Sequence, residues 1–63
     1  MFSILEFKAM LVQAFYLTEQ RKYKEALTKI QQIKNYLRKY EVLDKTIESD
    51  LDKLHNKILT LIN

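Results

Sequence analysis

Three side chains in the last third of the sequence have the types and spacing that acid–base or metal chemistry uses. Glu48, Asp52 and His55 follow one another at intervals of four and three residues. A carboxylate three residues before a histidine is a spacing found in carboxylate-bridged metal bundles. Such a site needs further carboxylates from facing helices, whereas Asp52 and His55 fall at the edge of an apolar stripe. We therefore interpret His55 as an ordinary boundary histidine beside a carboxylate, and we expect no metal ion.

Nucleophilic chemistry has fewer candidates still. The chain contains no cysteine, and neither Ser3 nor Ser49 has a histidine at helical spacing. Covalent catalysis needs a nucleophile with a base within hydrogen-bond reach. The sequence therefore predicts no catalytic residue, no cofactor and no enzymatic activity, and it indicates a function in binding.

Positive charge is concentrated in the middle of the chain. The formal net charge is +3, and residues 19–41 alone carry seven Lys or Arg against three Glu, a net +4. The candidate basic face of the second expected helix comprises Arg21, Lys24, Lys34, Arg38 and Lys39. It could contact phosphates non-specifically, but the sequence has neither a recognition-helix arrangement with a tight Gly turn nor a flexible basic arm. We interpret it as a solvated helix face and keep nucleic-acid binding as the alternative.

Helices must position all of these side chains. The 63 residues include no glycine and no proline, which are the residues that provide tight turns and punctuate strands. Good helix formers fill the sequence instead, so we expect one all-α domain over residues 1–63. A domain of this size buries only about 60% of its unfolded surface. Because the chain also lacks disulfides, we expect association with another chain to stabilise it.

Apolar residues recur every seven positions in two columns, as in the seam between packed helices. One column contains Phe2, Ala9, Tyr16, Tyr23, Ile30, Leu37, Asp44, Leu51 and Ile58. The other contains Leu5, Val12, Glu19, Ala26, Ile33, Tyr40, Ile47, Leu54 and Leu61. Leu43 adds to the same stripe at the start of the last helix, and Tyr36, which lies off the columns, is expected to be exposed.

Polar residues break these columns at Glu19 and Asp44, and Asp is a good N-cap for a new helix. Turning the chain at both breaks predicts a short antiparallel three-helix bundle with helices at about 2–18, 21–40 and 45–62, which dimerises. Residues 40–46 contain no strong stop signal, so the alternative is a helical hairpin with one long arm, forming a dimeric four-helix bundle. Ser49 and Asp52 would, as a capping box, begin the last helix later.

The first expected helix is apolar around most of its circumference. A helix of this kind has to be buried on more than one face, and two neighbouring helices in one short chain do not cover so wide an arc. The surplus predicts an interface. The candidate interface residues are Phe2, Leu5, Phe7, Met10, Leu11 and Phe15. We expect a second copy of the chain to bind there, and another protein is the further partner considered.

Residues 2–17 do not match a membrane segment or a targeting signal. Glu6, Lys8 and Gln13 interrupt the apolar stretch, which is also shorter than the roughly 20 residues of a membrane span and lacks a basic start. We expect a cytoplasmic protein with no transmembrane segment. The abundance of Lys, Ile, Leu, Tyr and Phe is compatible with an AT-rich genome, such as that of a virus or mobile element.

A small-residue pattern in residues 10–37 resembles a known helical hairpin. Its members are Ala14, Tyr23, Ala26, Ile30 and Ile33. They lie at the offsets of the packing residues in a tetratricopeptide repeat, and with a third helix the pattern also resembles the microtubule-interacting and trafficking domain. The resemblance implies a close antiparallel hairpin with Ala14 and Ala26 at the crossing, in a protein that binds peptides or helices of partners. The chain departs from the repeat at Arg21, where glycine is usual.

Together these patterns favour a non-enzymatic helical protein–protein interaction module, an adaptor or small regulator that acts as a homodimer. The alternative is a small nucleic-acid-binding regulator that uses the basic face of the second helix. Both functions depend on which side chains the helices leave at the surface.

Overall fold

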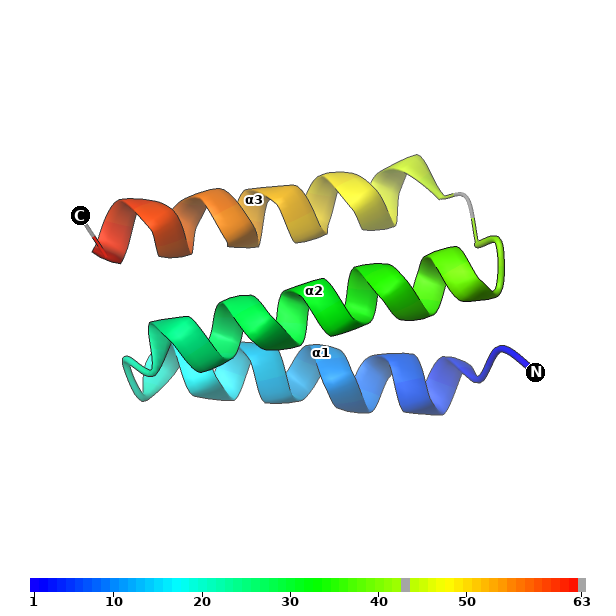
Figure 1. Cartoon of the computed structure of the whole chain (residues 1–63), viewed down its shortest axis with the longest axis horizontal. Coiled ribbons are helices and arrows are strands. Elements are labelled where there is room, and N and C mark those ends of the chain that lie inside the picture. Colours follow the sequence, from blue (N-terminus) through cyan, green and yellow to red (C-terminus); the bar gives the residue numbers. More distant parts are fainter. Residues whose placement is uncertain (43, 63) are drawn as a thin grey trace.

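The computed structural model describes residues 1–42 and 44–62, and this part of the chain forms three helices and no strand. Helix α1 spans Ile4–Glu19, α2 spans Tyr23–Lys39 and α3 spans Lys45–Ile62. Consecutive helices run in opposite directions (Figure 1), and the molecule measures 35 × 19 × 14 Å along its principal axes. The predicted antiparallel three-helix bundle is confirmed. The hairpin with one long arm is wrong, because α2 ends at Lys39 and α3 begins only at Lys45.

Side-chain caps define where α1 and α3 begin. The Ser3 hydroxyl accepts a hydrogen bond from the Glu6 backbone N–H at 3.2 Å, so α1 begins at Ile4 rather than at residue 2. The Asp44 carboxylate accepts from the N–H groups of Thr46 at 2.9 Å and Ile47 at 3.2 Å. Each cap satisfies N–H groups that have no partner inside the helix. Asp44 therefore starts α3 as predicted, and the later start at Ser49 is not used.

Both turns are closed by a residue in the left-handed conformation. Arg21 has φ 62° and Glu41 has φ 55°. After α1, the N–H of Lys22 donates to the Leu17 carbonyl at 2.9 Å, and after α2 the N–H of Val42 donates to the Leu37 carbonyl at the same distance. This is the Schellman motif, in which glycine usually takes the left-handed position. Because Arg21 closes the first turn, α2 begins at Tyr23 rather than at residue 21.

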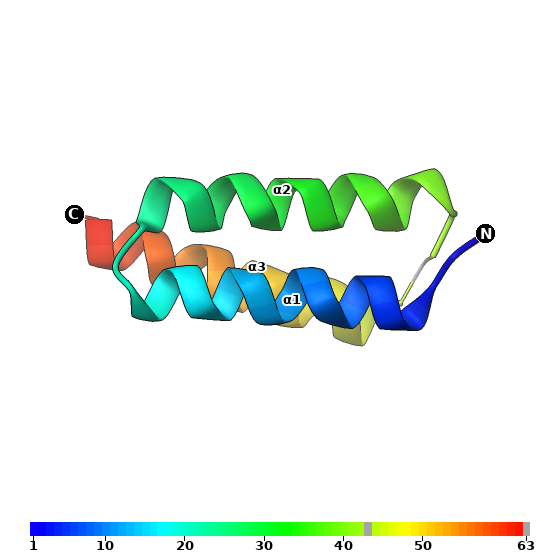
Figure 2. The ribbon, with the colours of Figure 1, turned by 90° about the horizontal axis from the view of Figure 1, so that it is seen from below.

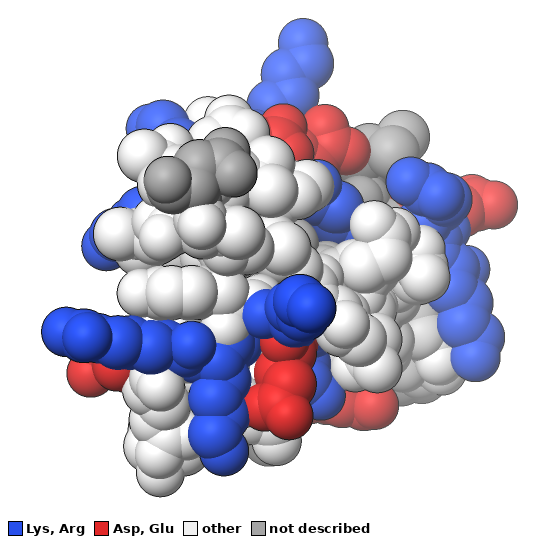
Figure 3. Space-filling view, turned by 60° about the vertical axis from the view of Figure 1, so that its left-hand side comes forward, with Lys and Arg blue, Asp and Glu red and all other residues white. Residues whose placement is uncertain are grey.

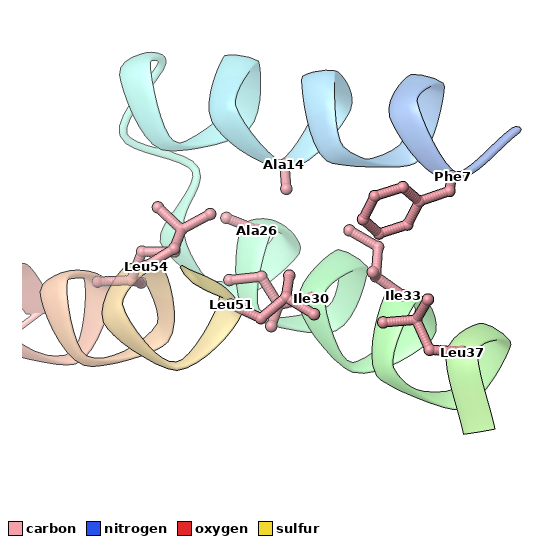
Figure 4. Close-up of a cluster of buried hydrophobic side chains, with 9 residues drawn as sticks. Phe7, Ala14, Ala26, Ile30, Ile33, Leu37, Leu51 and Leu54 are labelled. Carbon is pink, nitrogen blue, oxygen red and sulfur yellow. The ribbon is translucent and has the colours of Figure 1, made fainter. Parts of the chain in front are cut away.

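The contact between α1 and α2 is the closest in the molecule. Ala14 on α1 and Ala26 on α2 are both 0% exposed, and Ala14 points toward α2 in Figure 4. Small side chains let two helix backbones approach, so larger residues can pack on either side of the crossing. Phe7 of α1 fills the space beyond it, next to Ile33 and Leu37 of α2 (Figure 4). Ala14 and Ala26 are therefore the small residues at the contact between the two helices.

Helix α3 packs mainly against α2. Leu51, Leu54 and Ile58 belong to the same buried cluster as Ile30 of α2, and Leu51 lies beside Ile30 in Figure 4. α2 therefore contributes to two contacts, whereas α1 and α3 approach one another less closely. Two views at right angles show the three helices lengthwise (Figures 1 and 2). Leu43, predicted to begin the apolar stripe of the last helix, lies outside the described residues.

Candidate interaction surface on helix α1

The predicted interface residues divide into three groups. Phe7 belongs to the core, with 8% of its surface exposed. Phe2, Met10 and Leu11 are half-buried and pack against that core. Leu5 and Phe15 are exposed. Helix α1, to which the sequence assigns the interface, therefore carries uncovered apolar surface, but some of the predicted interface residues face the core.

The uncovered residues of α1 form a continuous face, which we call the α1 outer face. It consists of Leu5, Ala9, Val12 and Tyr16. Leu5 is 78%, Val12 65% and Tyr16 62% exposed. These residues follow one another at intervals of four, three and four, so they lie along one side of a helix with 3.6 residues per turn. Ile4 and Phe15, also exposed, lie beside this face.

The seven-residue columns assigned the α1 outer face to the interior, and for α1 that prediction is wrong. The columns identify most of the inner faces of α2 and α3, where Ile30, Ile33 and Leu51 are buried, but Leu61 near the end of α3 is exposed. In α1 apolar residues occur on nearly every side, so periodicity does not distinguish inside from outside. The structure turns Ala14 inward instead, because only a small residue fits at the crossing with Ala26. Ala14 and Ala26 were the sequence signal that located the inner side.

An aromatic cluster explains why Phe2, the first of the predicted interface residues, is not free to bind a partner. The Phe2 ring lies 5.6 Å from that of Tyr36 and 6.3 Å from that of Phe7, between ring centroids. The Ser3 backbone N–H donates to the Tyr36 hydroxyl at 2.9 Å, and that hydroxyl donates to the Glu6 carboxylate at 3.3 Å. Tyr36 is half-buried, so the expectation that it is exposed is wrong. The cluster attaches the start of α1 to the end of α2.

A shallow groove follows the open side of the bundle between α1 and α3. Leu11, Phe15 and Leu54 provide its apolar lining, and its charged rim comes from Asp50, Lys53 and Lys57 of α3. Its volume is about 340 Å³. The groove exists because α1 and α3 each pack closely against α2 but not against each other. It borders the side of α1 on which Phe15 is exposed.

The predicted basic residues have different surroundings. Lys34 faces α3 and forms an ion pair with Asp52 at 3.1 Å, and Arg38 lines a second groove there beside Glu48. The Lys39 ammonium lies 5.4 Å from the centre of the Tyr40 ring, while Arg21 belongs to the first turn. Figure 3 shows Lys and Arg side chains standing apart around a largely uncharged surface. Lys24 is exposed on α2, and of the five residues Lys34 is the one whose charge is paired within the described part of the chain.

The members of the carboxylate–histidine set of α3 differ in their contacts. Asp52 pairs with Lys34 of α2, Glu48 is exposed and His55 is half-buried. Over residues 1–42 and 44–62, no group of three or more His, Asp or Glu side chains is arranged to hold a metal ion. The spacing that resembles a metal bundle is used here for an ion pair between two helices.

No helix within the described residues is both long enough and apolar enough to cross a bilayer. Comparisons with protein-family models, with curated proteins and with solved structures find no match.

Proposed function

We propose that this chain is a non-enzymatic helical protein–protein interaction module, an adaptor or small regulator that acts in the cytoplasm as a homodimer. The observation that carries the proposal is the α1 outer face, where Leu5, Val12 and Tyr16 are each more than half exposed. Contiguous apolar surface on a small monomer is characteristic of an interaction site. Here it lies on the helix side opposite Ala14, so a partner would bind without disturbing the bundle.

The total surface supports the same proposal. The chain exposes 4918 Å², whereas a folded monomer of its mass is expected to expose about 4300 Å². The excess of roughly 600 Å² approaches the roughly 800 Å² that each partner contributes to a standard protein–protein interface. A dimer that covers the α1 outer face would bring the exposed area back into the ordinary range.

The surroundings of the basic residues favour protein over nucleic acid as the partner. A phosphate backbone is bound best by Lys and Arg side chains clustered on one surface, but Lys34 is paired with Asp52 and Arg21 lies in the first turn. The two partners are separated by titration with duplex DNA at two salt concentrations. The proposal expects no binding even at low salt, and binding that weakens steeply with salt would favour the nucleic-acid function instead.

The direct test of the proposal is sedimentation of the wild-type chain and of Val12→Glu. The wild type should form dimers at micromolar concentration, and Val12→Glu should be monomeric with its helical circular-dichroism spectrum intact, because a charge on the α1 outer face opposes burial without touching the core. Gln32→Glu, on an exposed position of α2, is the matched control and should remain dimeric. A wild-type chain that stays monomeric at about 100 µM, well above the range of a specific interface, would remove the support for a homodimer.

A further inference from the structure

The two edges of the α1 outer face differ in charge. With about 100° of rotation per residue, Lys8 and Glu19 lie along one edge of this face, and Gln13 and Gln20 lie along the other. All four side chains are exposed. The apolar face therefore has one edge with a cation near its start and an anion near its end, and a second edge formed by two amides; the Glu6 carboxylate lies beyond Gln13 on that side, where it accepts a hydrogen bond from the Tyr36 hydroxyl.

Lys8 and Glu19 do not neutralise each other within the chain. They are eleven residues apart on one helix, about 16 Å along its axis. The single ion pair among the described residues joins Lys34 and Asp52 on the other side of the molecule. The two charges beside the α1 outer face thus remain available to a bound partner.

Helix direction decides what these charges meet when two copies of α1 pack together. In an antiparallel pair each edge faces the same edge of the second copy, whereas in a parallel pair it faces the opposite edge. Antiparallel packing therefore sets Lys8 against Glu19 of the second copy, and does so twice by symmetry. Parallel packing would set the same charges against Gln13 and Gln20.

We propose, on the basis of the homodimer proposed above, that the second copy binds antiparallel along α1 with Val12 close to the two-fold axis. Lys8 of one copy and Glu19 of the other then lie about 5 Å apart along the helix axis. A lysine side chain spans this distance. Ala9 keeps the two backbones close beside Val12. Twice the whole-chain excess of roughly 600 Å² is about 1200 Å², which sets the scale of surface that two copies could cover and lies at the lower end of stable interfaces.

Charge reversal tests the pairing. Lys8→Glu alone or Glu19→Lys alone replaces both ion pairs by like charges and should weaken dimerisation about tenfold at low salt. A mixture of these two variants should form heterodimers more tightly than either variant forms homodimers. In the heterodimer the two introduced charges are opposite and face each other, and the unchanged Lys8 of one copy faces the unchanged Glu19 of the other. The double variant should dimerise like the wild type. If mixing brings no recovery, the antiparallel pairing is wrong.

Cross-linking gives an independent measurement, because the chain has no cysteine of its own. Val12→Cys should form an intermolecular disulfide on oxidation, since a disulfide needs Cα atoms about 6 Å apart. Leu5→Cys should not, because antiparallel copies of residue 5 are about 21 Å apart along the axis. Disulfides in both variants would indicate parallel packing and overturn the inference.

The two proposals fail in different ways. A dimer that cross-links through Leu5→Cys, or whose charge variants do not recover on mixing, contradicts only the antiparallel arrangement. A chain that stays monomeric, and instead binds vesicles of phosphatidylcholine and phosphatidylserine, contradicts the homodimer and with it the arrangement.

Discussion

Two side chains hold backbone positions that glycine would fill at lower cost. Arg21 and Glu41, with φ 62° and 55°, each close a turn in the left-handed region, which costs a residue with a Cβ about 1–2 kcal/mol. Their N–H groups still donate to the carbonyls of Thr18 and Arg38, both at 3.1 Å. The hydrogen bonds that end each helix are thus made, but at a conformational cost.

Replacing Arg21 by glycine is therefore expected to stabilise the fold. The left-handed position becomes free of Cβ repulsion, and we expect the free energy of unfolding to rise by about 0.5–1 kcal/mol after the greater flexibility of glycine in the unfolded chain is subtracted. Chemical denaturation followed by circular dichroism measures the change. Lys22→Gly is the matched control, because Lys22 has φ −90° and gains nothing from glycine. A loss of stability in Arg21→Gly would contradict this view of the turn.

At the scale of the helices, Ala14 decides how α1 is oriented. It is fully buried opposite Ala26, whereas Ala9 on the same helix is exposed. The two alanines are equal in helix propensity and differ only in their surroundings, which makes them a matched pair for testing the crossing.

Ala14→Leu should destabilise the bundle, because three additional carbon atoms do not fit between helices held this close. We expect a loss of about 1–3 kcal/mol in the free energy of unfolding. Ala9→Leu adds the same atoms to the α1 outer face and, with both variants made in the monomeric Val12→Glu background, should not lower that free energy. Thermal denaturation of both variants checks the comparison, and equal losses would mean that Ala14 is not at the helix crossing.

The sequence predicts the helices better than it predicts the surface. Three helices and the Asp44 cap follow from periodicity and capping chemistry, and in α2 and α3 the same periodicity identifies most of the buried faces. In α1 periodicity does not identify the buried face. Phe7 is buried and Leu5 is exposed, yet both residues are apolar. The first residue of α1 depends on the Ser3 cap, and the first residue of α2 depends on the left-handed Arg21. Because arginine stands where glycine is usual, the sequence gives no signal for that left-handed position.

For the whole molecule, the small core makes association and stability inseparable. Only nine apolar side chains are buried among the described residues, and a partner that binds the folded state alone stabilises it by mass action. The homodimer proposed here would supply that contribution, and the monomer would have to fold without it.

The melting temperature should accordingly depend on protein concentration. Each tenfold increase is expected to raise it by about 5 °C for a chain of this size, because dissociation accompanies unfolding. Differential scanning calorimetry over roughly a hundredfold range of concentration measures the shift. Val12→Glu serves as the reference whose melting temperature stays constant, and a wild type that behaves in the same way would argue against a dimer.

The central place of α2 has a consequence for how the chain opens. α1 and α2 share the closest contact in the molecule, while α3 packs mainly on α2, so the first two helices form a local unit to which α3 is added. Contacts between neighbours in sequence form early, and units with fewer contacts open more easily. Amide protons of α3 should therefore exchange with deuterium sooner than those at the Ala14–Ala26 crossing. Hydrogen exchange followed by NMR would display this as two levels of protection along one short chain.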